Sequence, residues 1–290
     1  MTKAPESAAT DRTIPQRWSD YSDEEHAVWD VLFARQAKQL QGRATKAFLD
    51  GLDILHLSKP GIPDFEELSG RLQKATGWRV VAVPGLIPED VFFDHLANRR
   101  FVAGRFIRKR RELNYLKEPD IFHDVFGHVP LLAHPVFADY MQAYGVGGLR
   151  SMKFGALHKL ARLYWYTVEF GLIKEGERLS IYGAGIVSSH AESRFALDDP
   201  SPNRLSFDLM RVMRTPYRID DYQQTYFVID SFEQLLKETL DTDFAPLYAR
   251  LERLPDFSIT DILPEDRVLS RGTQAYARLK AGGRAQKPAT

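Results

Sequence analysis

The sequence predicts a single, mostly α-helical domain with a few short β-strands, an α+β arrangement. Segments whose apolar residues recur at helical spacing outnumber the short β-branched runs. No internal repeat and no Pro/Ser-rich linker divides the 290 residues, so one domain is the simplest arrangement. We expect this domain to span residues 18–270, between a disordered polar tail at residues 1–17 and a flexible basic tail at residues 271–290.

Composition restricts the classes of function. Lys and Arg number 39, as do Asp and Glu, so no overall field would recruit nucleic acid or an anionic membrane. The chain has no cysteine, which excludes disulfides and thiolate metal sites and leaves His, Asp and Glu as metal ligands. No apolar run is long enough to cross a bilayer and the N-terminal residues are polar, so we expect a cytoplasmic protein.

Three helices are expected before residue 78. The first begins after Ser22, because Ser22 and Glu25 have the spacing of a capping box. The second is expected within residues 44–55. The third lies within residues 62–77 and should end at Gly77.

The next segments predict a strand, a helix and a second strand. The segment "WRVVAVPGLIP", residues 78–88, predicts a short β-branched strand that ends in a turn at Pro84 and Gly85. Residues 89–99 have helical character. Residues 100–110 begin with a second short strand.

In the second half, residues 155–175 show the strongest helical pattern. Its predicted apolar face consists of Leu157, Leu160, Ala161, Tyr164, Val168 and Leu172. Another helix is expected at residues 230–240. Residues 257–269 predict a terminal hairpin that turns around Pro264.

The stretch "PDIFHDVFGHVP", residues 119–130, contains two histidines five residues apart. On an ideal α-helix five residues turn the side chain by about 140°, so the rings of His123 and His128 would diverge. A helix that begins at Pro119 should end at Gly127, after which His128 could turn back towards His123. For an arbitrary pair at this spacing, ordinary core histidines would be the more common outcome.

Glu169 is the best candidate for a third, anionic ligand. It is a lone carboxylate in "LYWYTVEFGL", where an unpaired buried charge would be costly. The alternative is an exposed glutamate on an amphipathic helix. Two histidines and one carboxylate form the pattern of non-haem iron(II) sites that activate dioxygen, although spacing alone would also allow a zinc hydrolase.

At these residues the chain resembles the aromatic amino acid hydroxylases, which are tetrahydropterin-dependent iron enzymes, and it is most similar to their bacterial phenylalanine 4-hydroxylases. The resemblance extends from about Trp18 to Leu269 and implies the catalytic fold of that family. It rests on "VPGLIP", "RFIR", "EPDIFHDVFGHVPLL", "LARLYWYTVEFGLI" and "IYGAGIVSSHAE", which occur in the family's order.

The resemblance also implies site residues. The iron ligands match His123, His128 and Glu169. The pterin site matches Val83, Gly85, Leu86, Ile87, Phe92, Asp124 and Tyr164, with Phe92 as the stacking ring. The substrate site matches Arg108, Trp165, Ser188 and Glu192. A guanidinium suits the α-carboxylate of an amino acid, whereas from the sequence alone the basic run around Arg108 would be solvated. Residues 78–88 alone would predict only a buried strand and turn.

The implied activity is phenylalanine 4-hydroxylation, in which L-phenylalanine, O₂ and a tetrahydropterin give L-tyrosine and a hydroxypterin. It would serve phenylalanine catabolism and tyrosine biosynthesis. Alternatives within the family are hydroxylation of tryptophan, of tyrosine or of phenylalanine at position 3. A zinc hydrolase or a non-catalytic amino-acid sensor are alternatives from other classes. Because the chain shows neither the regulatory domain nor the tetramerisation helix of animal members, we expect a monomer that contacts neither nucleic acid nor membrane.

Overall fold

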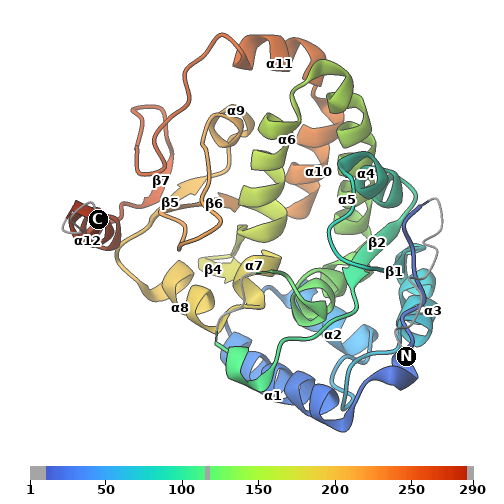
Figure 1. Cartoon of the computed structure of the whole chain (residues 1–290). Helices are drawn as coiled ribbons and strands as arrows, with labels where there is room; N and C mark the ends of the chain where they lie inside the picture. Colours follow the sequence, from blue (N-terminus) through green and yellow to red (C-terminus); the bar gives the residue numbers. More distant parts are fainter. Residues whose placement is uncertain (1–10, 115–117, 286–290) are drawn as a thin grey trace.

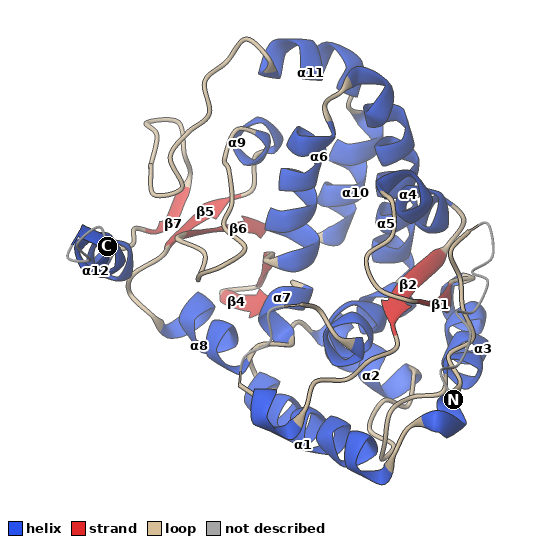
Figure 2. Cartoon of the chain, in the orientation of Figure 1, coloured by secondary structure: helices blue, strands red, loops and turns tan. Residues whose placement is uncertain are grey.

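The computed structural model describes residues 11–114 and 118–285. Helices dominate the molecule and two small β-sheets lie among them, so the predicted mostly helical fold with a few short strands is confirmed (Figures 1 and 2). Among the described residues, no helix is both long and apolar enough to cross a membrane. The predicted cytoplasmic location stays a prediction.

The helical segments of the N-terminal half are α1 (Asp23–Leu40), α2 (Lys46–Ile54), α3 (Phe65–Thr76), α4 (Glu89–Ala97) and α5 (Pro135–Ser151), with the short turns η1 (Trp18–Asp20), η2 (Arg110–Glu112), η3 (Phe122–His128) and η4 (Val129–Ala133). Those that follow are η5 (Met152–Phe154), α6 (Leu157–Tyr164), η6 (Trp165–Glu169), α7 (Ala184–Val187), α8 (His190–Asp198), α9 (Leu209–Met213), α10 (Phe232–Asp241), α11 (Phe244–Leu251) and α12 (Ala275–Ala285).

Local signals place the first three helices as predicted. Ser22 caps α1 through its side chain while Glu25 bonds back to the Ser22 backbone, which forms the expected capping box. The carboxylate of Asp64 accepts two backbone N–H groups at the start of α3. Gly77 ends α3 with a φ of 79°, a left-handed conformation that glycine adopts readily.

Strands β1 (Arg79–Val83) and β2 (Arg100–Gly104) form a parallel pair that α4 connects. Both strands and the helix were predicted. The loop after β1 carries the "PGLIP" turn, and α4 packs closely on α5. In the parallel arrangement the ends of both strands point the same way, so Val83 and Gly104 lie side by side.

The second sheet has five strands in the order β4-β3-β6-β5-β7. These are β3 (Leu172–Glu175), β4 (Arg178–Ile181), β5 (Asn203–Ser206), β6 (Thr225–Ile229) and β7 (Val268–Ser270). Two predictions were wrong here. The helix predicted for residues 155–175 ends at Glu169, and Leu172 begins strand β3, which forms a hairpin with β4. The predicted hairpin at residues 257–269 does not form, because β7 pairs with β5 instead.

The two predicted tails are partly ordered against the domain. Within the predicted N-terminal tail, Ile14 forms an antiparallel bridge with Ala82 of β1, and Gln16 bonds to the Pro63 carbonyl. Within the predicted C-terminal tail, residues 275–285 form α12, which lies at the edge of the molecule near β7 (Figure 1). The remaining tail residues, 1–10 and 286–290, lie outside the described part of the chain.

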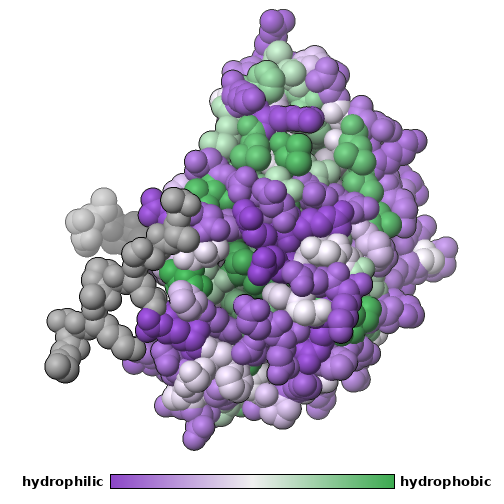
Figure 3. All heavy atoms as spheres, turned by 90° about the vertical axis from the view of Figure 1, so that its right-hand side faces the viewer, coloured by the Kyte–Doolittle hydropathy of each residue, from purple (hydrophilic) through white to green (hydrophobic). Residues whose placement is uncertain are grey.

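One main core fills the space between these elements. It includes residues of both π-helical turns, η3 and η6, and large aromatic side chains such as Trp29, Phe122 and Phe126 are fully buried in it. On the face shown in Figure 3, hydrophilic side chains cover most of the surface and apolar ones form separate patches between them. Because both turns contribute residues to this core, His123, His128 and Glu169 lie on segments that are packed from several sides.

Candidate metal centre

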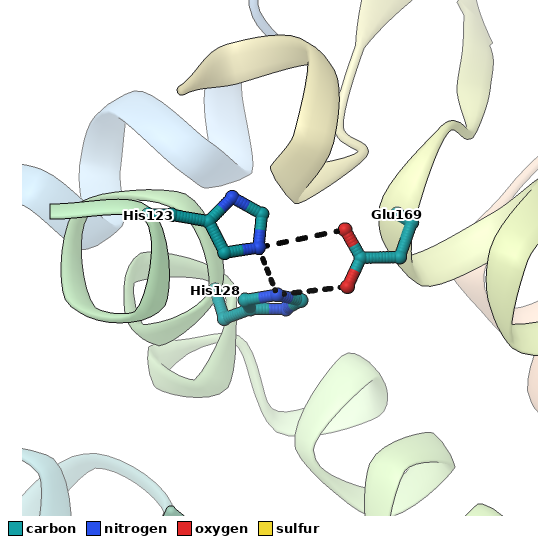
Figure 4. Close-up of side chains that lie close together, drawn as sticks. All are labelled: His123, His128 and Glu169. Carbon is teal, nitrogen blue, oxygen red and sulfur yellow. Dashed lines mark hydrogen bonds and ion pairs between the residues drawn. The ribbon is translucent and has the colours of Figure 1, made fainter. Parts of the chain in front are cut away.

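His123, His128 and Glu169 converge in the interior (Figure 4). The two histidines come from η3, and Glu169 is the last residue of η6. Nε2 of His128 lies 3.3 Å from Nε2 of His123 and 3.1 Å from Oε1 of Glu169. Nε2 of His123 lies 3.7 Å from Oε2 of Glu169. Four possible ligand atoms thus surround one small space.

The histidines meet because η3 is π-helical, which differs from the predicted helix that ends at Gly127. A π-helix is bonded between residues five apart, so two residues at this spacing stand on the same side of it. Gly127 lies inside the turn and allows close packing instead: a Cβ there would lie 3.0 Å from the Ala184 carbonyl oxygen of α7. The helical path then continues through His128 into η4.

Glu169 also stands on a π-helical turn, because α6 widens into η6 at Trp165. The amide of Phe170 closes this turn by donating to the Trp165 carbonyl at 2.8 Å. The small residues of "YGAG" pack on it, since a Cβ at Gly183 would lie 2.5 Å from the Glu169 carbonyl oxygen. The side chain of Glu169 is only 14% exposed, which excludes the exposed glutamate considered as an alternative.

Neighbouring groups fix the orientation of His123. Its Nδ1 lies 2.9 Å from the Ser188 hydroxyl, and that hydroxyl donates to the Ala184 carbonyl at 2.7 Å. Since the single hydroxyl proton is used in this way, the hydroxyl accepts from Nδ1–H of His123. The lone pair of His123 is then on Nε2, which faces His128 and Glu169.

Electrostatics favour the ionisation states that metal ligands need. Burial acts to raise the pKa of Glu169, but the nearby His128, which also bonds to it, and His123 hold that pKa below its usual value. Burial lowers the pKa of His123. An ionised carboxylate and a neutral imidazole therefore face each other at neutral pH, as divalent-metal binding requires.

A cavity of about 430 Å³ opens on one side of these three residues. It is lined by all seven residues matched to the pterin site, namely Val83, Gly85, Leu86, Ile87, Phe92, Asp124 and Tyr164. The Phe92 and Tyr164 rings meet edge to face at 6.3 Å. Asp124 accepts the Gly104 amide at 2.7 Å, and burial raises its pKa to about 7.

A second cavity of about 580 Å³ opens on another side and is lined by all four residues matched to the substrate site, Arg108, Trp165, Ser188 and Glu192. Arg108 is 9% exposed, unlike the solvated basic run that composition alone would suggest. Its Nε and Nη2 each donate to Asp120 at 2.8 Å. Among the described residues, Nη1 of Arg108 makes no hydrogen bond, so this side of the guanidinium faces the cavity wall without a protein partner there.

Two of these lining residues, Trp165 and Glu192, are fixed by contacts with neighbouring side chains. The Trp165 indole stacks on Tyr217 at 4.3 Å, and its Nε1 donates to Gln223 Oε1 at 3.1 Å. Glu192 accepts the Tyr226 hydroxyl and, at 3.4 Å, the Gln223 amide. Burial raises the pKa of Glu192 to about 7.

The two cavities meet at two of the three candidate ligands, His123 and Glu169, while His128 lines the first cavity only. They share Glu118, Pro119, His123, Trp165 and Glu169 as lining residues. A metal held by His123, His128 and Glu169 would therefore be reached from both cavities.

Comparison with known protein families agrees with the resemblance seen in the sequence. The family described as biopterin-dependent aromatic amino acid hydroxylase matches residues 8–250. The chain belongs to this family. The hydroxylase is 62% identical over 280 residues to the phenylalanine-4-hydroxylase of Caulobacter vibrioides, with 97% of this chain and 94% of the relative covered.

Solved structures give the same result for the fold of the hydroxylase. The cobalt-bound phenylalanine hydroxylase of Chromobacterium violaceum superimposes with a TM-score of 0.88 at 55% identity, covering 91% of this chain and 95% of that one. The iron- and phenylalanine-bound structure from the same organism gives a TM-score of 0.86 at 56% identity, covering 90% and 95%.

Sequence reasoning missed three residues that shape the site of the hydroxylase: Asp120, Tyr217 and Gln223. Asp120 had a usable signal, because it lies in the histidine motif three residues before His123 and also accepts the His123 amide. Tyr217 and Gln223 lie in "YRIDDYQQ", which has no chemical pattern of its own. Their role comes from tertiary contacts, those of both residues with Trp165 and that of Gln223 with Glu192.

Proposed function

We propose that this hydroxylase converts L-phenylalanine to L-tyrosine with O₂ and a tetrahydropterin, at one iron(II) held by His123, His128 and Glu169. The observation that carries the proposal is that the three candidate ligands form one cluster, two members of which, His123 and Glu169, line both cavities. The proposal is supported by the phenylalanine-4-hydroxylases of Caulobacter vibrioides and Ralstonia nicotianae, to which the chain is 62% and 58% identical.

The residues present fit iron(II). Two imidazole Nε2 atoms and one carboxylate, without a thiolate, provide three ligands and leave positions open. When bound, the iron and the pterin supply the electrons and the dioxygen activation for ring hydroxylation. Ser188 keeps the lone pair of His123 on Nε2, and the charge on Glu169 offsets part of the charge of the metal.

The protein's own contribution is to hold the two organic molecules beside the metal and to exclude water. In the first cavity, Phe92 provides a ring face for a flat heterocycle and Asp124 provides a polar group. In the second, Arg108 would bind the α-carboxylate through its Nη1 side and Glu192 would bind the α-ammonium group. The Trp165 indole forms the wall against which the aromatic side chain lies.

The proposal is tested by purifying His128→Ala and Glu169→Ala with iron(II) added under argon. Both variants should bind no stoichiometric iron and should form no tyrosine when O₂, a tetrahydropterin and phenylalanine are supplied. His158→Ala is the matched control, because His158 is an exposed histidine of α6 outside the site.

Near-normal tyrosine formation by His128→Ala would contradict the ligand assignment. A wild-type protein that retains zinc in place of iron would favour a hydrolase, and binding of phenylalanine without pterin-dependent O₂ uptake would favour a sensor. Product identification separates attack at position 4 from attack at position 3 and phenylalanine from the other aromatic substrates.

A further inference from the structure

The C-terminal helix α12 lies beyond residue 250, where the family match ends, yet it is attached to the body at defined points. Before the helix, the Thr273 amide donates to the Pro200 carbonyl at 2.8 Å, and the side chain of Gln274 donates to the Gln224 carbonyl at 3.2 Å. The Tyr276 amide donates to the Ser201 hydroxyl at 2.9 Å. The start of α12 is therefore held in one place.

Side chains of α12 contact residues 218–223, a segment that we call the cavity loop. Asp221 in this loop is nearly buried, and its Oδ1 accepts the Tyr276 hydroxyl at 2.5 Å and the Tyr222 amide at 3.0 Å. Its Oδ2 lies 3.6 Å from Nζ of Lys280 and 3.9 Å from Nη2 of Arg218. One carboxylate thus joins two residues of α12 to the middle of the loop.

Aromatic packing strengthens the same attachment. The Tyr276 ring lies 5.2 Å from the ring of Tyr222 and meets the ring of Phe195 of α8 edge to face at 5.4 Å. Tyr222 and Phe195 are themselves stacked at 4.5 Å. Tyr276 therefore contacts both the cavity loop and the helix that carries Glu192.

The other contacts of the cavity loop lead to the substrate residues. Ile219, Asp220, Asp221 and Tyr222 all line the second cavity. The next residue, Gln223, accepts Trp165 Nε1 on its side chain and donates its amide to Glu192. The Gln223 side chain also donates to the Arg218 carbonyl at 2.9 Å, which ties it to the start of the loop.

We propose that α12 positions the wall of the amino-acid cavity, with Tyr276 and Lys280 acting through Asp221 and the cavity loop on Trp165 and Glu192. This inference rests on the proposed function, because it assigns the second cavity to the aromatic amino acid. Neither Tyr276 nor Lys280 lines either cavity, so both are positioning residues and not catalytic ones. The cavity loop has an exposed tip, with Ile219 80% exposed, and α12 limits its movement.

The test uses Tyr276→Phe, which removes one hydroxyl and keeps the ring, and Lys280→Met, which keeps the length of the side chain without its charge. The measurements on the full chain are the calorimetric Kd for phenylalanine with iron(II) under argon, kcat and KM for phenylalanine and for tryptophan, and KM for the pterin. Tyr276→Phe should raise the Kd and the KM for phenylalanine about three- to tenfold, because a hydrogen bond to a charged acceptor is lost. The preference for phenylalanine over tryptophan should fall, and the KM for the pterin should not change.

Tyr248→Phe of α11 is the matched control, since this tyrosine packs against Phe154 and Phe244, away from the cavity loop. Asp221→Asn should produce the same shift, and the double variant with Tyr276→Phe should be no worse than either single variant. An unchanged Kd and an unchanged preference in Tyr276→Phe would overturn the inference, as would equal changes for phenylalanine and pterin. A wild type that forms no tyrosine would refute the proposed function, while the calorimetric Kd values would still decide the role of α12.

Discussion

Replacing Ser188 by alanine tests whether the hydroxyl group selects the ligand tautomer of His123. In the structure this hydroxyl donates to the Ala184 carbonyl and accepts from Nδ1 of His123. Ser188→Ala removes the acceptor, so Nδ1–H is left buried without a partner, or the proton moves to Nε2 and blocks the ligand atom. Either outcome weakens metal binding and leaves the three ligands in place.

The expected size of the effect follows from the group that is lost. A buried donor without a partner costs about 1–3 kcal/mol. Groups that orient a ligand histidine typically contribute about 10–100-fold to metal affinity, which corresponds to about 1.4–2.7 kcal/mol. We therefore expect the Kd for iron(II) to rise by about one to two orders of magnitude. Competition with a coloured iron(II) chelator under argon measures this Kd directly.

Ser193→Ala is the control, because this hydroxyl is buried in the neighbouring α8 and bonds to the His190 carbonyl, not to a ligand. At saturating iron(II), Ser188→Ala should recover a large part of its turnover. If the iron(II) affinity of Ser188→Ala equals that of the wild type and of Ser193→Ala, then the hydroxyl does not set the tautomer and the reasoning fails.

Four other expectations concern the cavities, the stability of the fold and the assembly. Trp165→Phe should shift the ratio of kcat/KM values towards tryptophan, because a smaller side chain leaves more room for the indole, and pocket size discriminates by about 1–3 kcal/mol. An unchanged ratio would exclude Trp165 as a determinant of substrate preference. Burial raises the pKa of Glu192 to about 7, so phenylalanine should bind more tightly as pH rises through that value, whereas binding to Glu192→Gln should be flat from pH 6 to 8. Because the pKa of Glu192 is higher in the folded state, its contribution to the free energy of unfolding is fully present below the unfolded pKa and is lost as the pH rises through 7. Relative to the wild type, Glu192→Gln should therefore be more stabilised, by melting temperature, at pH 8 than at pH 5. Light scattering at micromolar concentration should give a mass near 33.2 kDa, and a stable tetramer would contradict the expected monomer.

Local chemistry was enough to predict most of the first half of the fold. The capping box of Ser22 and Glu25 and the left-handed Gly77 act within four residues, so their effect can be read from the sequence. The run "VVAV" before Pro-Gly likewise predicted β1. His123, His128 and Glu169 could also be nominated as candidate ligands from their residue types and apolar surroundings, although a histidine pair at this spacing is more often part of a core, and the structure brings the three together.

The width of a helical turn could not be predicted, because packing against distant segments contributes to it. The turn of η3 packs Gly127 on Ala184, and the turn of η6 packs Glu169 on Gly183, contacts between residues far apart in the chain. A helix model with 3.6 residues per turn therefore suggested that His128 had to leave the helix. The same limit applies to Arg108, which is paired with Asp120 twelve residues later and not solvated.

Two cavities that share few walls allow the two halves of this enzyme to diverge separately. Phe92 belongs to one cavity and Ser188 to the other, while the common wall is formed by Glu118, Pro119 and Trp165 together with two of the candidate ligands. Under the proposed assignment of the cavities, selection for another amino acid can therefore alter the second cavity without disturbing the cavity for the pterin. The shared residues tolerate least change, since a substitution there alters both binding sites at once. A library for a new substrate would best vary the cavity loop first and leave the common wall intact.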